Sequence, residues 1–325
     1  MAASLDYPLL FQPTFRDYIW GGRRLGTILG KPIPESGPVA ESWEVVDHGE
    51  DQSVVANGPL QGQTLKQLVS RFPGELFGKN TASFSFPLLF KFLDANRDLS
   101  IQVHPDDTQG ATLDPPDLGK TEAWYIMDTD PGAKVYVGLK EGISRGDLES
   151  AVAANRVIEC MHVVEPSPGD CLFIPAKTVH ALGKGLLVAE IQQASNTTFR
   201  LFDWNRAGPD GKPRALHIEE SLATIDYQRG PVKPQTPLAT DDPGVHRLVS
   251  CDKFVLDRWH FAGERRLGDG HRFHIVAILE GEVTINHPEL PGPLGKGATF
   301  LVPAACGPLA LNALRHTTLL DMYLP

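Results

Sequence analysis

The amino-acid sequence predicts a mainly β protein built from two barrels with a few short helices. The first observation is the abundance of turn formers, because 31 glycines and 27 prolines divide the 325 residues. The second is that most apolar runs have the length of a strand and lie between such turns. The third is a short internal repeat, in which residues 169–175 and 297–303 each run from a glycine to a proline around an apolar segment. A chain of this length supports one large or two smaller domains, and the repeat favours two.

Helical signals are few. Thr64 can cap a helix whose apolar residues 65, 68 and 69 share one face. Two further helices are expected at residues 144–155 and 216–227. The remaining apolar runs predict strands, which in chain order are PLLFKFLDA, LSIQVH, AWYIMD, KVYVGL, CLFIPA, LLVAEIQQ and FRLFDW.

A proline-rich segment divides the chain. Residues 231–244 hold four prolines and almost no apolar side chains, which favours an extended linker over a packed element. We therefore expect a first domain at residues 1–230, a linker at 231–244 and a second barrel at 245–325.

Charge and composition restrict the class of partner. The formal net charge of −10 argues against nucleic acid, whose phosphates require a basic surface. A small anion remains possible, because a few local cations can bind one phosphate group. The 42% hydrophobic and 22% charged residues are typical of a globular protein.

The sequence predicts a cytoplasmic protein. Its four cysteines are scattered, which favours reduced thiols over a disulfide framework. The first residues lack the basic region of a secretory signal, and no apolar run reaches the ~18 residues of a membrane span. We expect no membrane partner and a monomer or weak dimer.

The segment LSIQVHPDD, residues 99–107, indicates a site. Because side chains alternate along an extended strand, Ser100, Gln102 and His104 project to the same side. Glu122 follows in GKTEAWY and His180 in PAKTVH. If the three segments converge, a metal ion has four protein ligands.

Spacing alone leaves this interpretation open, because a glutamine and a histidine two apart are more often unrelated polar residues. The ligand types suit a divalent metal such as zinc, which binds imidazole nitrogen and carboxylate oxygen. With one carboxylate among the ligands, such an ion keeps a local positive charge that can polarise a substrate oxygen. The second copy of the repeat has Pro308 where the first has His180, so no metal site is expected there.

The wider sequence resembles the type I mannose-6-phosphate isomerases, zinc-dependent enzymes of the cupin superfamily, and in particular their short bacterial form. The similar stretches cover most of the first 230 residues, whereas residues 240–325 match only as a second cupin-like barrel. These stretches are IWGGRRLG, AESWEV, PLLFKFLDANRDLSIQVHPDD, GKTEAWYIM, PGDCLFIPAKTVHALGKG and EIQQASNTTFRLFDWNR.

The resemblance implies two cupin-like (jelly-roll) barrels, with catalysis in the first. It also implies one Zn2+ per chain and interconversion of mannose 6-phosphate and fructose 6-phosphate through a cis-enediol. The zinc ligands implied by the resemblance are those reached from spacing, namely Gln102, His104, Glu122 and His180.

Further positions match the active site of the family. From these we expect substrate and phosphate contacts from Lys91, Ser100, Arg200 and Arg206. Arginine suits phosphate because its planar group donates two parallel hydrogen bonds. Lys120 and Glu190 are the candidates for proton transfer, with Arg200 as a third catalytic residue.

One departure from the family concerns Asn196 in ASNTTFR. Relatives often carry an acidic residue at this position, four before the arginine. Asn196 cannot act as a base, although it can hydrogen-bond a sugar hydroxyl.

Two other functions compete. A cupin dioxygenase would use two histidines and one carboxylate on iron, which leaves Gln102 and the cations unexplained. A non-catalytic sugar-phosphate sensor would keep the cations and could lose the metal, yet all four ligand positions are present.

Overall fold

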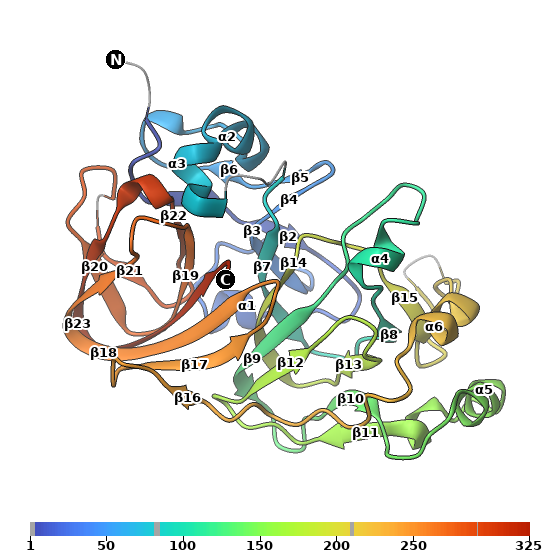
Figure 1. Ribbon diagram of the computed structural model, residues 1–325. Coiled ribbons are helices and arrows are strands. Elements are labelled where there is room, and N and C mark those ends of the chain that lie inside the picture. Colours follow the sequence, from blue (N-terminus) through green and yellow to red (C-terminus); the bar gives the residue numbers. More distant parts are fainter. Residues whose placement is uncertain (1–3, 81–84, 209–210, 291) are drawn as a thin grey trace.

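The computed structural model describes residues 4–80, 85–208, 211–290 and 292–325, and its antiparallel sheets confirm the mainly β prediction (Figure 1). The first region contains two facing sheets. The five-stranded sheet has the order β11 (Met161–Val164), β10 (Val135–Leu139), β13 (His180–Leu182), β8 (Ile101–Val103) and β15 (Phe199–Phe202). The six-stranded sheet has the order β12 (Cys171–Ile174), β9 (Glu122–Thr129), β14 (Leu186–Gln193), β7 (Leu88–Ala95), β3 (Glu41–Val45) and β2 (Thr14–Arg16).

The period of two along these strands separates two cores. On β14, Leu186 and Val188 enter a buried cluster between the two sheets, together with Trp124 of β9 and Val135 of β10. Leu187, on the opposite face of β14, enters a different cluster. A six-stranded sheet that is buried on both faces explains why LLVAEIQQ reads as an almost continuous apolar run.

The second region is a ten-stranded sheet. It contains β16 (Leu238–Ala239), β17 (Val245–Ser250), β18 (Val255–Leu267), β23 (Leu309–Tyr323), β19 (His274–Glu280), β22 (Thr299–Val302), β1 (Leu9–Gln12) and β6 (Val54–Val55) in that order. β20 (Glu282–Ile285) pairs with β23, and β21 (Leu294–Gly295) pairs with β20. The strand β1 pairs with β22, so Leu9 and Leu10 lie beside Leu301 and Phe300 in one sheet. A short hairpin of β4 (Asp47–His48) and β5 (Asp51–Gln52) stands apart.

A shared core joins the two regions. Phe90 and Phe92 of β7 and Ala189 of β14 face Ile275 of β19 and Met322 of β23 in one buried cluster. Burial of these apolar side chains provides a hydrophobic contribution at the junction.

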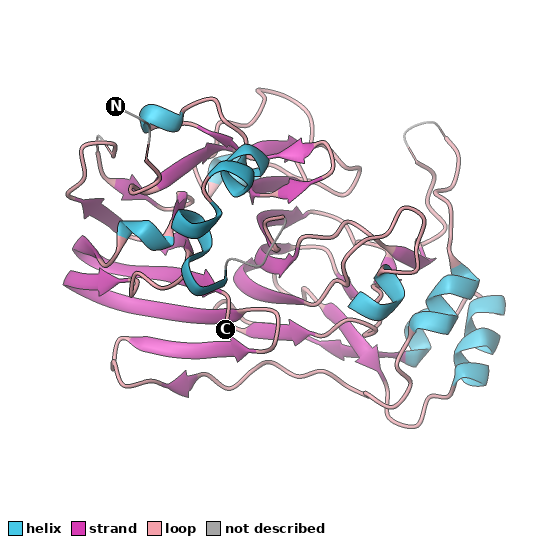
Figure 2. Ribbon diagram, turned by 45° about the horizontal axis from the view of Figure 1, so that its top comes forward, coloured by secondary structure: helices cyan, strands magenta, loops and turns pink. Residues whose placement is uncertain are grey.

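The helices lie at the margins of the strand layers (Figure 2). α2 (Leu65–Arg71) begins at Thr64, whose hydroxyl accepts from Gln67 N in a capping box, and α5 (Arg145–Ala153) begins at Ser144 in the same way. The structure thus confirms the three expected helices, the third being α6 (Ile218–Thr224). The others are α1 (Arg24–Thr27), α3 (Pro73–Phe77) and α4 (Asp107–Gly110), with 3-10 turns η1 (Gly58–Leu60), η2 (Gly78–Asn80), η3 (Val157–Cys160) and η4 (Ala304–Cys306).

The internal repeat corresponds to the same local structure in both regions. Gly169 and Gly297 each turn the chain with positive φ, of 97° and 84°, just before the four-residue buried strands β12 and β22. A residue with a side chain would be strained there, which explains the glycine in both copies.

The proline-rich segment runs along the first barrel and adds the short strand β16 to the second. Val232 N donates to Val137 O and Gln235 N donates to Cys171 O. The division into 1–230, 231–244 and 245–325 stays a prediction. In the described part of the chain, no helix combines the length and apolar character needed to cross a membrane.

Candidate functional site

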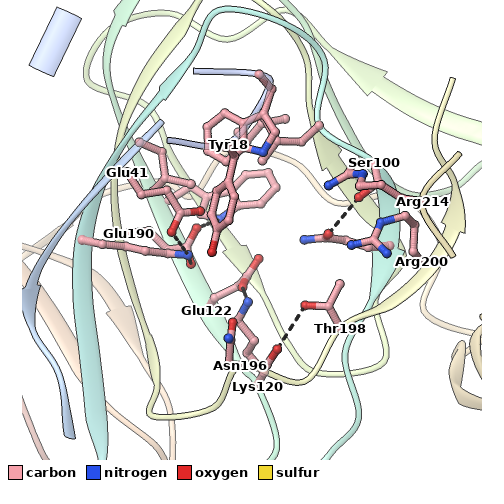
Figure 3. Close-up of a pocket in the computed structure, with 17 residues that line it drawn as sticks. Tyr18, Glu41, Ser100, Lys120, Glu122, Glu190, Asn196, Thr198, Arg200 and Arg214 are labelled. Carbon is pink, nitrogen blue, oxygen red and sulfur yellow. Dashed lines mark hydrogen bonds and ion pairs between the residues drawn. The ribbon is translucent and has the colours of Figure 1, made fainter. Parts of the chain in front are cut away.

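A cavity of about 330 Å³ opens between the two sheets of the first barrel (Figure 3). Strand register brings distant residues to it. His180 of β13 and Arg200 of β15 both lie opposite Gln102 of β8 in the five-stranded sheet. In the facing sheet, Glu190 of β14 lies opposite Lys91 of β7 on one side. The polar residues that line the cavity are Tyr18, Glu41, Lys91, Ser100, Gln102, Lys120, Glu122, Glu190, Asn196, Thr198, Arg200 and Arg214.

Three candidate metal ligands form a tight buried cluster. The ligand atoms of His104, Glu122 and His180 all lie within 4.8 Å of one another. His180 Nε2 is 3.1 Å from Glu122 Oε1, and His104 Nε2 is 3.7 Å from Glu122 Oε2. Each of the three residues is 1% exposed, so water does not solvate the carboxylate.

Both histidines are oriented for metal binding. His104 Nδ1 donates to Thr197 O and His180 Nδ1 donates to Thr178 O, each at 2.8 Å. Because a carbonyl only accepts, Nδ1 carries the proton and Nε2 presents its lone pair to the cluster. Such backbone partners are typical of metal-ligating histidines.

The charges of the cluster leave a place for a cation. Burial lowers the pKa of His180 to about 4 and that of His104 well below its usual value, so both rings are neutral. Burial also raises the pKa of Glu122, and the neighbouring Lys120 opposes this rise. Glu122 Oε2 and His180 Nε2 are buried and have no hydrogen-bond partner among the described residues. Orphaned acceptors of this kind are costly, and a divalent ion would satisfy them.

Gln102 lies at the edge of the cluster. Its amide nitrogen is 3.5 Å from His104 Nε2, and its amide oxygen accepts from Ser100 Oγ at 3.2 Å. The strand geometry expected for residues 100–104 therefore holds, with Ile101 and Val103 buried on the opposite face.

The acidic wall of the cavity is organised around one lysine. Lys91 Nζ lies 3.3 Å from Glu41 Oε2 and 3.4 Å from Glu190 Oε1. Burial opposes the ammonium charge, but Glu190 and Glu41 outweigh it and raise the pKa of Lys91. Trp124 Nε1 donates to Glu190 Oε2 at 3.0 Å, and Trp43 Nε1 donates to Glu41. Lys91 is therefore a permanent cation and Glu190 a fixed carboxyl group.

Lys120 lies beside the ligand cluster. Its ammonium nitrogen is 3.7 Å from Glu122 Oε2, and its side chain is buried. Figure 3 shows Lys120 and Asn196 together at the side of the cavity that holds Glu122. The arrangement places a side-chain nitrogen next to the candidate metal site.

The cationic wall faces Glu41 and Glu190 across the cavity, with Ser100, Arg200 and Arg214 on that side in Figure 3. Arg200 Nη1 donates to Ala215 O at 2.9 Å, and its Nε is buried without a partner among the described residues. The cavity is therefore bipolar.

The structure does not bring Arg206 into this cavity. Arg206 Nη2 lies 2.8 Å from Asp203 Oδ1, and its Nη1 donates to Asp98 O. Arg214, which sequence reasoning missed, lines the cavity instead, while its Nε and Nη2 donate to the two oxygens of Asp203 at 2.7 and 2.6 Å.

Other lining residues were also missed. Tyr18, which is 39% exposed, lines the cavity, and so do Trp20 and Glu41. Glu41 carried a signal, because it precedes Trp43 by two on a buried strand and so shares its face. Tyr18 and Arg214 lie in irregular segments, where no periodicity indicates a direction.

A carboxylate behind the site holds the loop that contacts His104. Asp117 Oδ2 accepts from Ser195 Oγ at 2.8 Å, from Asn196 N at 3.3 Å and from Thr197 Oγ1 at 2.7 Å. Its Oδ1 accepts from His48 Nε2 at 3.1 Å and from Leu118 N at 2.8 Å. Partial burial opposes these contacts, which together hold the pKa of Asp117 below its usual range.

Comparison with known proteins gives one consistent family. A model of the type I phosphomannose isomerase catalytic domain matches residues 9–131, and a model of the mannose-6-phosphate isomerase cupin domain matches residues 245–319. A mannose-6-phosphate isomerase of Bacillus subtilis is 36% identical over 94% of this chain and 96% of its own. One from Streptococcus mutans is 36% identical over 91% and 92% of the two chains.

Solved structures agree with the sequence matches. The crystal structure of the mannose 6-phosphate isomerase from Bacillus subtilis superposes with a TM-score of 0.89 at 31% identity, covering 98% of this chain and 99% of that one. Together with the cupin-domain match, this confirms the expected cupin fold.

Proposed function

Because the chain belongs to the type I phosphomannose isomerase family, we propose that it interconverts mannose 6-phosphate and fructose 6-phosphate with a bound zinc ion. The observation that supports this most strongly is the buried cluster of His104, Glu122 and His180, whose free acceptor atoms border a bipolar cavity. A site that joins metal ligands to paired lysine, glutamate and arginine side chains suits an isomerase better than a simple binding module.

The residues that would hold the zinc ion are His104, Glu122, His180 and Gln102. Two neutral imidazoles and a carboxylate are ligands that zinc prefers. Gln102 would offer its amide oxygen after a half-turn of the amide group, with the amide nitrogen then donating to Ser100. When bound, zinc would polarise the substrate carbonyl and offset negative charge that develops on its oxygen.

The bipolar cavity gives the substrate a direction. We propose that Arg200, Arg214 and Ser100 bind the phosphate group, because guanidinium groups match its oxygens bidentately. The open-chain sugar then extends toward Lys120 and Glu190, with C1 and C2 beside the metal ligands. Lys91 holds Glu190 in position through their 3.4 Å ion pair, and Asn196 can hydrogen-bond a sugar hydroxyl.

Proton transfer follows from this placement. A proton leaves C2 of the open-chain aldose, and the electron pair of that bond forms the double bond of a cis-enediol. Return of a proton to C1, with transfer of the hydroxyl proton from the oxygen on C2 to that on C1, gives the ketose. We propose that Lys120 and Glu190 carry these protons, with Arg200 as a third catalytic group, because Lys120 and Glu190 line the cavity that Glu122 also lines and are shielded from water.

We also propose that residues 1–230 form the catalytic unit, with 231–244 as linker and 245–325 as a barrel without a metal site. All residues that line the catalytic cavity precede residue 215. Among the described residues, His104, Glu122 and His180 are the one group of three such ligand side chains close enough to share a metal ion. One chain supplies the whole site, which suits a monomer or weak dimer.

One experiment tests this function against its competitors. The purified protein is assayed for bound metal by elemental analysis and for fructose 6-phosphate formation in a coupled assay. We expect one zinc per chain and rapid isomerisation. Stoichiometric iron without isomerisation would support a dioxygenase, and sugar-phosphate binding without metal or turnover would support a sensor.

Matched histidine variants locate the site. His104→Ala should lose zinc and turnover while the protein stays folded by circular dichroism. His162→Ala, on the partly exposed strand β11, should keep both. A zinc-loaded, active His104→Ala protein refutes the ligand assignment.

A further inference from the structure

The interior of the second barrel changes from apolar to charged at one end. On β18, β23 and β19, the residues at Phe261, Leu319 and Val276 belong to the apolar cluster inside this barrel. Side chains an even number of residues apart share a face of a strand. His274 therefore shares the face of Val276 on β19, Asp321 that of Leu319 on β23, and Asp257 that of Phe261 on β18. These three are 6%, 2% and 4% exposed.

The charged residues form a paired network. His274 Nδ1 donates to Asp321 Oδ1 at 2.8 Å. Arg247 donates to both oxygens of Asp257, and Tyr323 Oη donates to Asp257 Oδ2 at 2.8 Å. Asp257 and Asp321 lie directly opposite each other on β18 and β23, where like charges repel, so each needs its own cation.

A buried charged network costs free energy that a barrel with a purely structural role would not need to spend. Taking charged groups out of water costs several kcal/mol per ion, and an apolar replacement is often neutral or stabilising. The apolar face of β18, β19 and β23 could continue to the barrel end without this cost. The charged end therefore points to a binding role.

A cavity of about 600 Å³ opens at this end. Arg247, Arg266, Arg272, Trp259 and His274 supply its hydrogen-bond donors. It shares no lining residue with the catalytic cavity of the first barrel.

The donors and acceptors of this cavity are unbalanced. The three side-chain carboxylates that line the cavity, those of Asp257, Asp269 and Asp321, each already accept a hydrogen bond from a neighbour. Asp269 also lies 3.5 Å from Arg272 Nε. By contrast, Trp259 Nε1 and His274 Nε2 are buried without a hydrogen-bond partner among the described residues, and Arg272 Nε has only its 3.5 Å contact with Asp269. Tryptophan and arginine nitrogens can only donate.

The state of His274 adds a donor. Burial opposes its charge, but Asp321 outweighs this and raises the pKa of His274, which favours an imidazolium with a proton on Nε2. The exposed side chain of Arg266 brings a further guanidinium to the cavity. The groups still in need of a partner are thus donors.

From this excess of donors we propose that the open end of the second barrel binds a small oxyanion, the phosphate or carboxylate group of a metabolite-sized ligand. Arg266 and Arg272 contact its oxygens, and His274, backed by Asp321, lies at the inner end. Leu324, which directly follows β23, packs against the core shared by both barrels.

Isothermal titration calorimetry tests the site with two probes, inorganic phosphate and malonate. Because the proposed function also places a phosphate group in the catalytic cavity, the titrations use the full-length protein and its Arg200→Ala variant. We expect Arg200→Ala to retain one anion-binding event. Stronger binding of phosphate assigns the site to phosphorylated ligands, and stronger binding of malonate assigns it to carboxylates.

The double variant Arg266→Gln, Arg272→Gln should weaken the retained event at least tenfold when combined with Arg200→Ala. In the wild-type background the same double variant should keep isomerase kinetics and stay folded by circular dichroism. Arg315→Gln, which changes an exposed arginine elsewhere on β23, is the control and should change neither anion binding nor isomerase kinetics. The proposal is overturned if Arg200→Ala binds neither anion, or if the event it retains survives Arg266→Gln, Arg272→Gln unchanged.

Discussion

Asp117 provides a sharp test of how the protein positions its metal ligands. Its carboxylate touches none of the candidate ligands, yet it holds the loop whose Thr197 carbonyl accepts from His104 Nδ1. Asp117→Asn keeps the shape of the side chain and removes its charge. We expect the loop to loosen and the His104 ring to lose its fixed orientation.

The magnitude follows from the five hydrogen bonds. Hydrogen bonds to a charged group contribute ~1.5–3 kcal/mol each, against ~1 kcal/mol for neutral ones. The asparagine oxygen can replace Oδ2 and keep the bonds from Ser195, Asn196 and Thr197 in neutral form. Its NH2 group then faces the N–H of Leu118, which loses its acceptor. We expect a loss of about 3 kcal/mol in unfolding free energy and of about 10–100-fold in metal affinity.

The pH dependence provides a second readout. The pKa of Asp117 is held below its usual range, so its contribution to stability is present above about pH 4 and is lost as the pH falls through the folded pKa. The hydrogen bond to Asp117 raises the pKa of His48, so the contribution of His48 is present below about pH 6.5 and is lost as the pH rises through the folded pKa. The stability difference between wild type and Asp117→Asn should therefore be largest between about pH 4 and 6.5.

Chemical denaturation across pH and zinc titration with a competing chelator measure the two effects. Asp114→Asn, which changes an exposed carboxylate three residues before Asp117, is the matched control and should behave as wild type. Wild-type zinc affinity in a folded Asp117→Asn protein would show that the loop does not orient His104. A stability difference that grows steadily above pH 7 would contradict the assigned ion pair.

Three further outcomes are expected. A strong chelator should abolish isomerisation and lower thermal stability, and added zinc should restore both; activity that persists in a metal-free sample contradicts the proposed cofactor. Arg200→Ala should raise KM for the sugar phosphate with zinc retained, whereas exposed Arg145→Ala should leave kinetics unchanged; equal KM values remove Arg200 from the phosphate site. Gly138→Ala should cost about 3 kcal/mol or more in unfolding free energy, because its φ is +75° and a Cβ would lie 2.2 Å from Gly230 O. Gly132→Ala, with φ of +74° and open space, should cost only ~1–2 kcal/mol, and equal losses in denaturation would discount the contact.

Periodic elements and short-range signals were predictable from the sequence. The capping residues Thr64 and Ser144 start helices as expected. The alternation in LSIQVH places Gln102 on the site-facing side of β8, between His180 and Arg200 in register. Both kinds of inference rest on geometry that a few neighbouring residues determine.

Irregular and non-local features were not predictable. Arg206 and Arg214 lie on either side of a loop, and their shared partner Asp203 is known only from the fold. The network of His274 and Asp321 joins residues 47 apart, each unremarkable in its own strand. Pairing of β1 with β22 requires knowledge of the whole sheet, because nothing in either strand selects the other.

That last pairing has a consequence for synthesis on the ribosome. Leu9 and Leu10 of β1 pair with Leu301 and Phe300 of β22, so this pairing cannot form until β22 has been synthesised. Until then, β1 can pair with β6 but offers an unpaired edge to other nascent chains. Vectorial folding can complete the first barrel, but the ten-stranded sheet is complete only when β1 pairs with β22. Deletion of β1 should therefore disturb the sheet of the second region, far from β1 in the sequence.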